Sequence, residues 1–183
     1  MPFHKTAFEG LWLFEPEVYE DERGFFYESY NQREFERNGI SAVFVQDNQS
    51  FSKYGVVRGL HYQVPPRAQA KLVRTVQGSI LDVILDLRRG SASLGRWASF
   101  MLSSENRKQL FIPRGFAHGF SVLSPTAEVF YKCDEFYSRE HERGILFNDA
   151  ALGIDWMIPG DKILVSDKDL RLPKFTEAEY HFE

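Results

Sequence analysis

The sequence is poor in cysteine and in long apolar runs. Cys133 is the only cysteine among 183 residues, which excludes an intrachain disulfide framework and a cysteine-based zinc site. No apolar run reaches the roughly 18 residues that a membrane span needs, and residues 1–6 lack the apolar core of a signal peptide. We therefore expect no membrane partner and a cytoplasmic location.

Basic charge and low-complexity sequence are also scarce. The chain carries 22 Lys and Arg against 26 Asp and Glu, a net charge of −4, which argues against a nucleic-acid partner. No Ser/Gly linker, biased tract or internal repeat divides it, so we predict a single domain over residues 1–183. A chain of this length buries roughly 70% of its unfolded surface and needs no disulfide or metal for stability.

Aromatic residues, by contrast, are abundant. The sequence contains 17 Phe, 8 Tyr and 3 Trp, together with 13 Gly and 8 Pro. This combination favours a sheet-rich fold with many turns over a helical bundle. Asn31 and Gly39 are suitable ends for one short surface helix.

Strand patterns account for much of the remaining chain. In one predicted strand Asp82 shares a face with Ile80 and Ile84, and in another His118 shares a face with apolar side chains. Short strands at this spacing are typical of an antiparallel β sandwich or barrel. The clearest strand segments are residues 71–76, 80–87, 116–122 and 127–133.

Two histidines and three polar segments are the candidates for chemistry. His61 and His118 lie in strand-like surroundings, where a buried, hydrogen-bonded histidine without a chemical role is the commoner outcome. No His-x-His or His-x-x-x-His pair occurs, so ligand spacing gives little support to a metal site. Residues 21–28, 46–50 and 166–169 have the composition of solvated turns.

Taken together, these segments match one family in order and spacing. The motifs are residues 21–26, 46–48, 55–63 (GVVRGLHYQ), 69–74 (QAKLVR), 112–120 (IPRGFAHGF), 131–132, 142–145 with 148–149, and 168–169. Each fragment is weak alone, but the set covers residues 3–173. Across that range the chain resembles the dTDP-4-dehydrorhamnose 3,5-epimerase family of nucleotide-sugar enzymes.

The resemblance implies a fold and a reaction. The fold would be a mainly β, cupin-type jelly roll with a few short helices, forming a homodimer and working without metal or organic cofactor. The substrate would be dTDP-4-dehydro-6-deoxy-D-glucose, inverted at C3 and C5 to dTDP-4-dehydro-L-rhamnose. Both carbons flank the C4 ketone, so the reaction needs a base, an acid and a group that stabilises the enolate oxygen.

The resemblance also implies catalytic roles. His61 would be the base, and Asp169 would be the carboxylate that orients it and stabilises its imidazolium form. Tyr131 would donate a proton from the opposite side of the sugar. Lys71 would stand near the C4 oxygen, where positive charge lowers the energy of the enolate more than that of the ketone.

Substrate binding is implied for a larger group of residues. Arg23 and Arg58 would contact the diphosphate or nucleotide, because a guanidinium fork suits phosphate. Phe26 and Tyr137 would stack on the thymine. Some of these contacts come from the partner subunit in the family, so Arg23, Phe26 or Glu28 would serve the neighbouring pocket. The implied binding residues are Arg23, Phe26, Glu28, Gln46, Asn48, Arg58, His118, Tyr137, Glu142 and Lys168.

The spacing of Arg58 and His61 does not suit a shared site on a regular strand. Residues three apart face opposite sides of a regular strand. Both can reach one pocket only if the strand is irregular, and Gly59 between them is a suitable place for a bulge. We therefore predict a bulge or twist at Gly59.

Three other functions stay open. A C3-only epimerase from an antibiotic-sugar pathway would share the base, the acid and the lysine. A catalytically silent cupin would bind a nucleotide sugar without needing an acid and a base together. A metal-dependent cupin enzyme is the third alternative.

Overall fold

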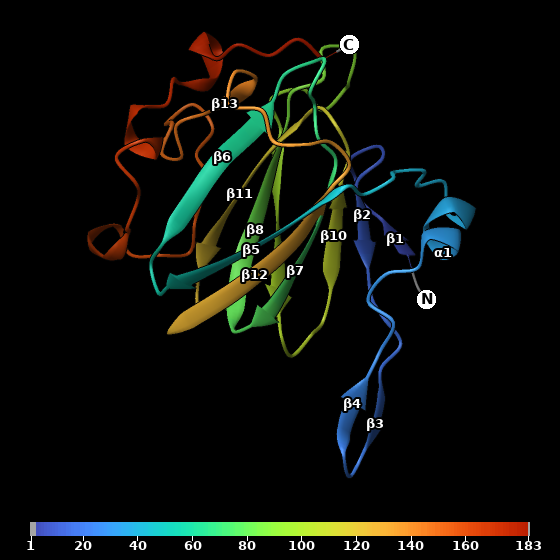
Figure 1. Ribbon diagram of the computed structural model, residues 1–183. Helices are drawn as coiled ribbons and strands as arrows, with labels where there is room; N and C mark the ends of the chain where they lie inside the picture. Colours follow the sequence, from blue (N-terminus) through green and yellow to red (C-terminus); the bar gives the residue numbers. More distant parts are fainter. Residues whose placement is uncertain (1–2, 183) are drawn as a thin grey trace.

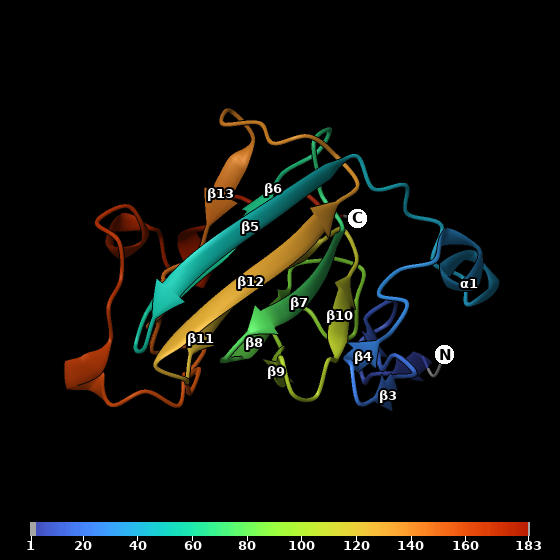
Figure 2. The same ribbon diagram turned by 60° about the horizontal axis from the view of Figure 1, so that its bottom comes forward.

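The computed structural model describes residues 3–182. Two antiparallel β-sheets pack face to face (Figures 1 and 2), with strand orders β1-β2-β10-β7-β12-β5 and β13-β6-β11-β8-β9. The prediction of a mainly β sandwich is thus confirmed. The strands are β1 (Phe3–Lys5), β2 (Trp12–Phe14), β3 (Tyr19–Asp21), β4 (Gly24–Phe26), β5 (Gln46–Lys53), β6 (Val57–Gln63), β7 (Lys71–Gln77), β8 (Ser79–Asp86), β9 (Trp97–Ser103), β10 (Gln109–Ile112), β11 (Phe116–Val122), β12 (Thr126–Cys133) and β13 (Glu142–Gly144).

The four predicted strand segments correspond to β7, β8, β11 and β12, to within a residue or two at their ends. The prediction of a solvated turn at residues 46–50 was wrong, because this segment begins β5. Gln46, Asn48 and Ser50 alternate with exposed residues, and β5 pairs with β12 along its whole length. An edge strand that places polar side chains on its inner face lacks the apolar alternation from which strands are usually recognised.

The predicted short helix is α1 (Gln32–Arg37), and it lies on the outer face of the first sheet. The Asn31 side chain accepts hydrogen bonds from the backbone N–H groups of Arg33 and Glu34, as an N-cap residue does. Phe35 is the buried residue of the helix, and it packs with Phe14 and Leu72.

An apolar core fills most of the space between the two sheets. Val73 of β7 and Val129 of β12 pack against Ile80 and Ile84 of β8 and Phe120 of β11. Because side chains alternate along a strand, the neighbours of these residues at two-residue spacing also point between the sheets. This rule determines which polar residues reach the site described below.

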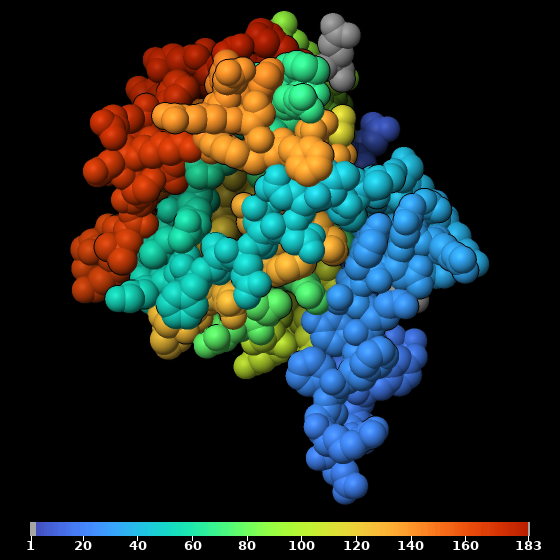
Figure 3. Space-filling model, viewed as in Figure 1, coloured from blue at the N-terminus to red at the C-terminus, as the bar shows by residue number. Residues whose placement is uncertain are grey.

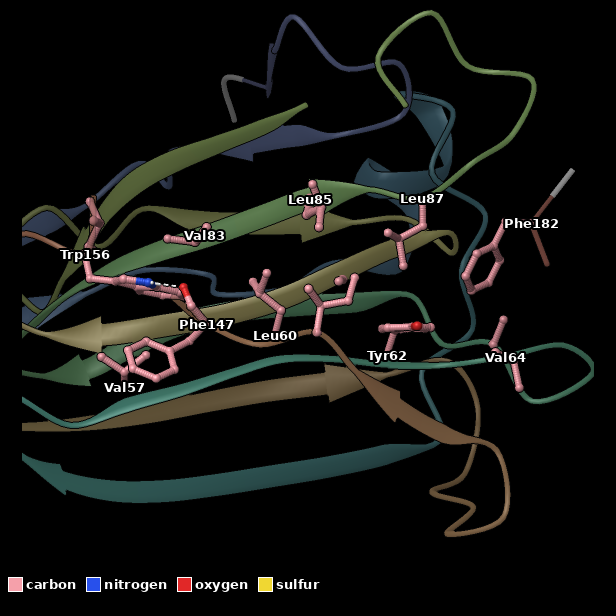
Figure 4. Packing of buried hydrophobic residues seen from close by; sticks show 14 residues of the cluster. Val57, Leu60, Tyr62, Val64, Val83, Leu85, Leu87, Phe147, Trp156 and Phe182 are labelled. Carbon is pink, nitrogen blue, oxygen red and sulfur yellow. Dashed lines mark hydrogen bonds between the residues drawn. The ribbon is translucent and has the colours of Figure 1, made fainter. Parts of the chain in front are cut away.

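Side chains from the segment after β13 pack on the outer face of the second sheet, in the cluster drawn in Figure 4. Phe147, Trp156 and Phe182 pack against Leu60 and Leu85 in a second apolar cluster. The indole Nε1 of Trp156 donates to the Phe147 carbonyl oxygen at 2.8 Å, so the polar atom of the buried ring is satisfied. The same segment contains three 3-10 turns, η1 (Gly160–Lys162), η2 (Asp169–Arg171) and η3 (Phe175–Glu177).

Strands β3 and β4 form a separate hairpin that projects from the sandwich (Figures 1 and 3). Arg107 contacts it, with its guanidinium 4.2 Å from the Phe25 ring centroid and 3.1 Å from a Glu20 carboxylate oxygen. The tip and the remaining aromatic surface are exposed, and Phe26 keeps 70% of its surface in solvent. Among residues 3–182 no helix is long and apolar enough to cross a membrane.

Candidate active site

A cavity of about 490 Å³ opens between the two sheets, at the end where the apolar core stops. A second hollow of about 260 Å³ adjoins it, and His61, Lys71 and Tyr131 line both. The larger cavity is also lined by Arg58, His118, Lys168 and Asp169, and the smaller by Gln46, Asn48, Cys133, Tyr137 and Glu142. All of these residues except Cys133 were predicted as site residues, so eleven predicted residues share one connected hollow.

His61 and Asp169 form a hydrogen-bonded pair at the cavity wall. The Nε2 atom of His61 lies 2.7 Å from Asp169 Oδ1, and Asp169 Oδ2 accepts from the Gly59 N–H at 3.3 Å. The backbone N–H of Asp169 donates to Ser166 Oγ at 3.1 Å, which fixes the turn. Burial alone would raise the pKa of Asp169, but the hydrogen bond and charge of His61 and the Gly59 amide lower it below its usual value.

The predicted irregularity at Gly59 is confirmed. On β11 the partners of His61 and Arg58 are His118 and Phe120, so three steps on β6 match two on β11. Gly59 has φ +118°, and a Cβ there would lie 2.6 Å from Gly119 Cα.

The bulge brings Arg58 to the same cavity as His61. Its Nε donates to Ser52 Oγ at 3.0 Å. A regular strand would turn this guanidinium away from the imidazole, so the close backbone approach at Gly59 and Gly119 determines the composition of the cavity wall.

Lys71 and Tyr131 come from the opposite sheet. They lie on the adjacent strands β7 and β12, and the Lys71 ammonium is 5.9 Å from the Tyr131 ring centroid. Burial lowers the pKa of Lys71, an effect that nearby Cys133, Asp82 and Glu142 oppose. Burial also raises the pKa of Tyr131, so its hydroxyl keeps its proton at neutral pH.

Glu142 links the residues at the rim of the cavity. Its Oε2 accepts from Lys168 Nζ at 2.6 Å and from the Tyr137 hydroxyl at 2.8 Å. The Tyr137 N–H in turn donates to Gln46 Oε1 at 2.9 Å, and Asn48 Nδ2 lies 3.7 Å from Cys133 Sγ. Burial opposes ionisation of Glu142, but the hydrogen bonds from Lys168 and Tyr137 lower its pKa overall.

Asp82 is a buried neighbour of the cavity that was not among the residues predicted from the sequence. It is completely buried, and its Oδ2 lies 2.8 Å from Nε2 of His118. The sequence does contain a signal, because an aspartate shares a strand face with Ile80 and Ile84 in an otherwise apolar segment. A carboxyl group in such a place needs a partner, and here that partner is His118.

Three of the residues singled out in the sequence lie away from this hollow. Arg23 and Phe26 are on the projecting hairpin, where Arg23 Nε donates to Asp21 Oδ1 at 3.1 Å. Glu28 follows the hairpin and accepts from Asn31 Nδ2 at 3.0 Å. Within residues 3–182, no group of three or more His, Cys, Asp or Glu side chains is placed to hold a metal ion.

Comparison with known proteins identifies close relatives. The family model described as dTDP-4-dehydrorhamnose 3,5-epimerase matches residues 5–177. The dTDP-4-dehydrorhamnose 3,5-epimerase of Shigella flexneri is 52% identical over 177 residues, covering 96% of this chain and 97% of the relative.

Solved structures of similar proteins point to the same family. The crystal structure of dTDP-4-dehydrorhamnose 3,5-epimerase from Elizabethkingia anophelis NUHP1 has a TM-score of 0.93 at 49% identity and covers 97% of both chains. The dTDP-6-deoxy-D-glucose-3,5-epimerase from Legionella pneumophila, in complex with dTDP-4-keto-L-rhamnose, has a TM-score of 0.92 at 44% identity and covers 96% of this chain and 93% of that chain. This chain belongs to the dTDP-4-dehydrorhamnose 3,5-epimerase family.

Proposed function

We propose that this chain epimerises dTDP-4-dehydro-6-deoxy-D-glucose at C3 and C5 to give dTDP-4-dehydro-L-rhamnose. The observation that carries the proposal is the placement of the His61–Asp169 pair opposite Lys71 and Tyr131 in one cavity. The relative from Legionella pneumophila was crystallised with dTDP-4-keto-L-rhamnose, in which both centres are inverted. That ligand supports a double epimerisation over inversion at C3 alone.

In this proposal His61 removes the proton next to the C4 ketone. Hydrogen bonding of Nε2–H to Asp169 leaves Nδ1 as the nitrogen with a free lone pair. The lowered pKa of Asp169 keeps this partner ionised, so that its charge stabilises the imidazolium formed in the step. A positioned base of this kind contributes about 10²–10⁴-fold to the rate.

Lys71 stabilises the enolate and Tyr131 returns the proton. The charge on the C4 oxygen develops during proton removal, so a fixed ammonium group favours the enolate over the ketone. Tyr131 holds its proton because burial raises its pKa. The base comes from β6 in one sheet and the acid from β12 in the other. A sugar between the sheets therefore meets them on opposite faces of its ring, as inversion requires.

The remaining cavity residues bind the nucleotide and sugar parts of the substrate. Arg58 and Lys168 line the larger cavity and offer positive charge to the diphosphate. Tyr137 lies half-exposed at the smaller hollow, where its ring can stack on thymine. Gln46, Asn48, His118 and Glu142 would supply polar contacts.

The hairpin of β3 and β4 would complete a partner's site in a homodimer. The hairpin that carries Arg23 and Phe26 projects from the sandwich (Figure 3), and both side chains are largely exposed, which a contact with a second copy would explain. Glu28 stands at the base of the same segment. Mixing an Arg23→Ala/Phe26→Ala variant with a His61→Ala variant should restore part of the activity, since one site of a mixed dimer is intact. Failure to restore activity when mixed dimers have formed would contradict the exchange.

The function is tested by proton exchange in D₂O with dTDP-4-dehydro-6-deoxy-D-glucose, followed by NMR. Deuterium at both C3 and C5, with the L-rhamno product, supports the proposal. Deuterium at C3 alone identifies the C3-only alternative, and absence of exchange leaves a nucleotide-sugar-binding protein. Activity that is lost on removal of metal and restored by adding it would support the metal-dependent alternative.

The role of Tyr131 has a separate test. Tyr131→Phe should leave proton removal partly intact, so that deuterium still exchanges while inversion slows, by about 10²-fold for loss of one acid. Comparing the rate of exchange with the rate of inversion separates the two steps. If the variant inverts both centres at the original rate, Tyr131 is not the acid.

A further inference from the structure

The buried pair His118–Asp82 adjoins the cavity and carries an unsatisfied atom. Asp82 Oδ2 is occupied by His118 Nε2 at 2.8 Å. Asp82 Oδ1 is buried and has no hydrogen-bond partner among residues 3–182. A buried carboxyl group left half-satisfied costs free energy, so its position between the sheets needs a compensating charge.

The strand geometry directs Asp82 towards Lys71. Ile80 and Ile84 of β8 pack with Val73 of β7 in the core between the sheets. Asp82 lies between the two isoleucines on the same strand face, and Lys71 precedes Val73 by two residues on the inner face of β7. Asp82 and Lys71 thus point into the space between the sheets beside the apolar residues, where they form a pair of opposite charges.

The other groups around Lys71 are less able to balance its charge. Glu142, the other nearby carboxylate, already accepts from Lys168 and Tyr137. Burial raises the pKa of Cys133, which keeps that thiol neutral. Several ionisable groups share the two hollows with Lys71 or act on its charge. They are Tyr131 and Cys133 of β12, Arg58, His61 and Tyr62 of β6, His118 of β11, Asp82 of β8, Tyr137, Glu142 of β13, and Lys168 and Asp169 at η2.

We propose that Asp82 is a positioning residue for the epimerisation: it anchors His118 at the cavity wall and serves as the counter-charge that keeps Lys71 an ammonium ion. The inference rests on the proposed function, because it concerns the group that stabilises the enolate. Asp82 is completely buried and lines neither hollow, so this role involves no contact with the substrate. It acts through His118 by a hydrogen bond and on Lys71 by its charge, against the burial that favours the neutral amine.

The test is Asp82→Asn, which keeps the shape and a hydrogen-bond acceptor for His118 but removes the charge. Loss of a negative charge lowers the pKa of Lys71, so the basic limb of the pH profile of kcat should move to lower pH by about one unit. Lys71 sets this limb because burial lowers its pKa and raises that of Tyr131. A less stable variant with an unmoved basic limb would overturn the proposal.

Asp86→Asn is the matched control. Asp86 is completely buried on the same face of β8, but its partners are Arg88, Ser91 and Ser93, away from the cavity. This variant should lose stability without moving the basic limb. An equal shift in both variants would mean that the limb reports general loosening of the fold, and would overturn the role of Asp82.

A measurement on the unaltered protein covers the case in which Asp82→Asn does not fold. With ¹³C-labelled aspartate and lysine, the carboxyl carbon of Asp82 should show an inflection at the pH where Lys71 titrates. Absence of this shared inflection would overturn the proposal. The NMR titration needs no substrate, so its failure is distinguishable from a failure of the epimerase function in the D₂O experiment.

Discussion

Two histidines lie side by side in the second sheet, and each is hydrogen-bonded to an aspartate. The two His–Asp pairs consist of the same residue types but differ in exposure and in the origin of the aspartate. His61 and His118 occupy directly paired positions on β6 and β11. The His61 side chain is 30% exposed, and its carboxylate comes from a turn far along the chain. The His118 side chain is 8% exposed, and its carboxyl partner lies on the neighbouring strand β8.

The difference shows how one residue pair can serve two purposes. An imidazole that abstracts a proton has to meet the substrate and tolerate a change of charge, and the cavity around His61 permits both. A histidine held between strands and anchored to a buried carboxyl group has little freedom to move. We infer that His61–Asp169 reacts, whereas His118–Asp82 supports the cavity wall.

The strongest test of this comparison is the effect of each histidine on activity. His61→Ala should lower turnover by at least about 10²–10⁴-fold, because it removes the base. His118→Ala should cost roughly 10-fold, the scale of one lost contact of about 1.4 kcal/mol. Steady-state assays with deuterium exchange measure both. Equal losses in the two variants would remove the distinction between the pairs. His4→Ala, which alters an exposed histidine, is the control and should keep the original activity.

The effect on stability should be the reverse. His118→Ala leaves the buried Asp82 without its hydrogen-bond partner and should lower the free energy of unfolding by about 3 kcal/mol. His61→Ala should change it by less than about 1 kcal/mol, because Asp169 keeps the Gly59 amide and water can enter. Urea unfolding followed by circular dichroism measures both. A greater loss of stability in His61→Ala would contradict our reading of the two pairs.

The bulge that places the pairs side by side can be broken with a single methyl group. At Gly59 a Cβ would lie 2.6 Å from Gly119 Cα and 2.7 Å from the His118 carbonyl oxygen. Gly59→Ala should therefore cost about 3 kcal/mol and most of the activity. Gly24→Ala is the control, since Gly24 has a similar φ of +124° but no heavy atom within 4 Å of the added Cβ. It should cost about 1 kcal/mol, and equal losses would rule out steric contact as the cause.

The smallest expected effect is on acid stability. Because the pKa of Asp169 is lower in the folded chain than its ordinary value of 3.8, its ionised form stabilises the fold above that pH. This contribution is lost as the pH falls through the folded-state pKa. The stability advantage of the unaltered chain over Asp169→Asn should thus shrink between about pH 5 and pH 3. A constant difference across this range would show that the carboxylate charge contributes nothing to folding.

Local patterns predicted much of the framework. Alternation located β7, β8, β11 and β12, and the capping residue Asn31 located α1. Arg58 and His61 are three residues apart and would face opposite sides of a regular strand, so a shared site required the irregularity at Gly59. The same reasoning failed at β5, because its inward-facing side chains are polar and line a cavity that no local pattern reveals.

The residues of the candidate site were predicted from the family resemblance, not from the spacing of residues in the sequence. That resemblance named the residues, and the fold brings eleven of them to the connected hollow. The roles of those residues, the homodimer, the single domain over residues 1–183 and the cytoplasmic location stay predictions. Asp82 was not predicted, because an aspartate in an apolar strand indicates only that its buried carboxyl group needs a polar partner, and not which residue supplies it.

What the sequence determined by itself is the family, the strand faces and the residue types that chemistry would use. These depend on local order, since side-chain direction repeats every two residues in a strand. Only the tertiary structure decided which groups meet. His61 and Asp169 are 108 positions apart, and His118 and Asp82 are 36 apart. Contacts over such separations follow from how the sheets and the C-terminal segment pack together, because burial selects the arrangement in which polar groups find partners.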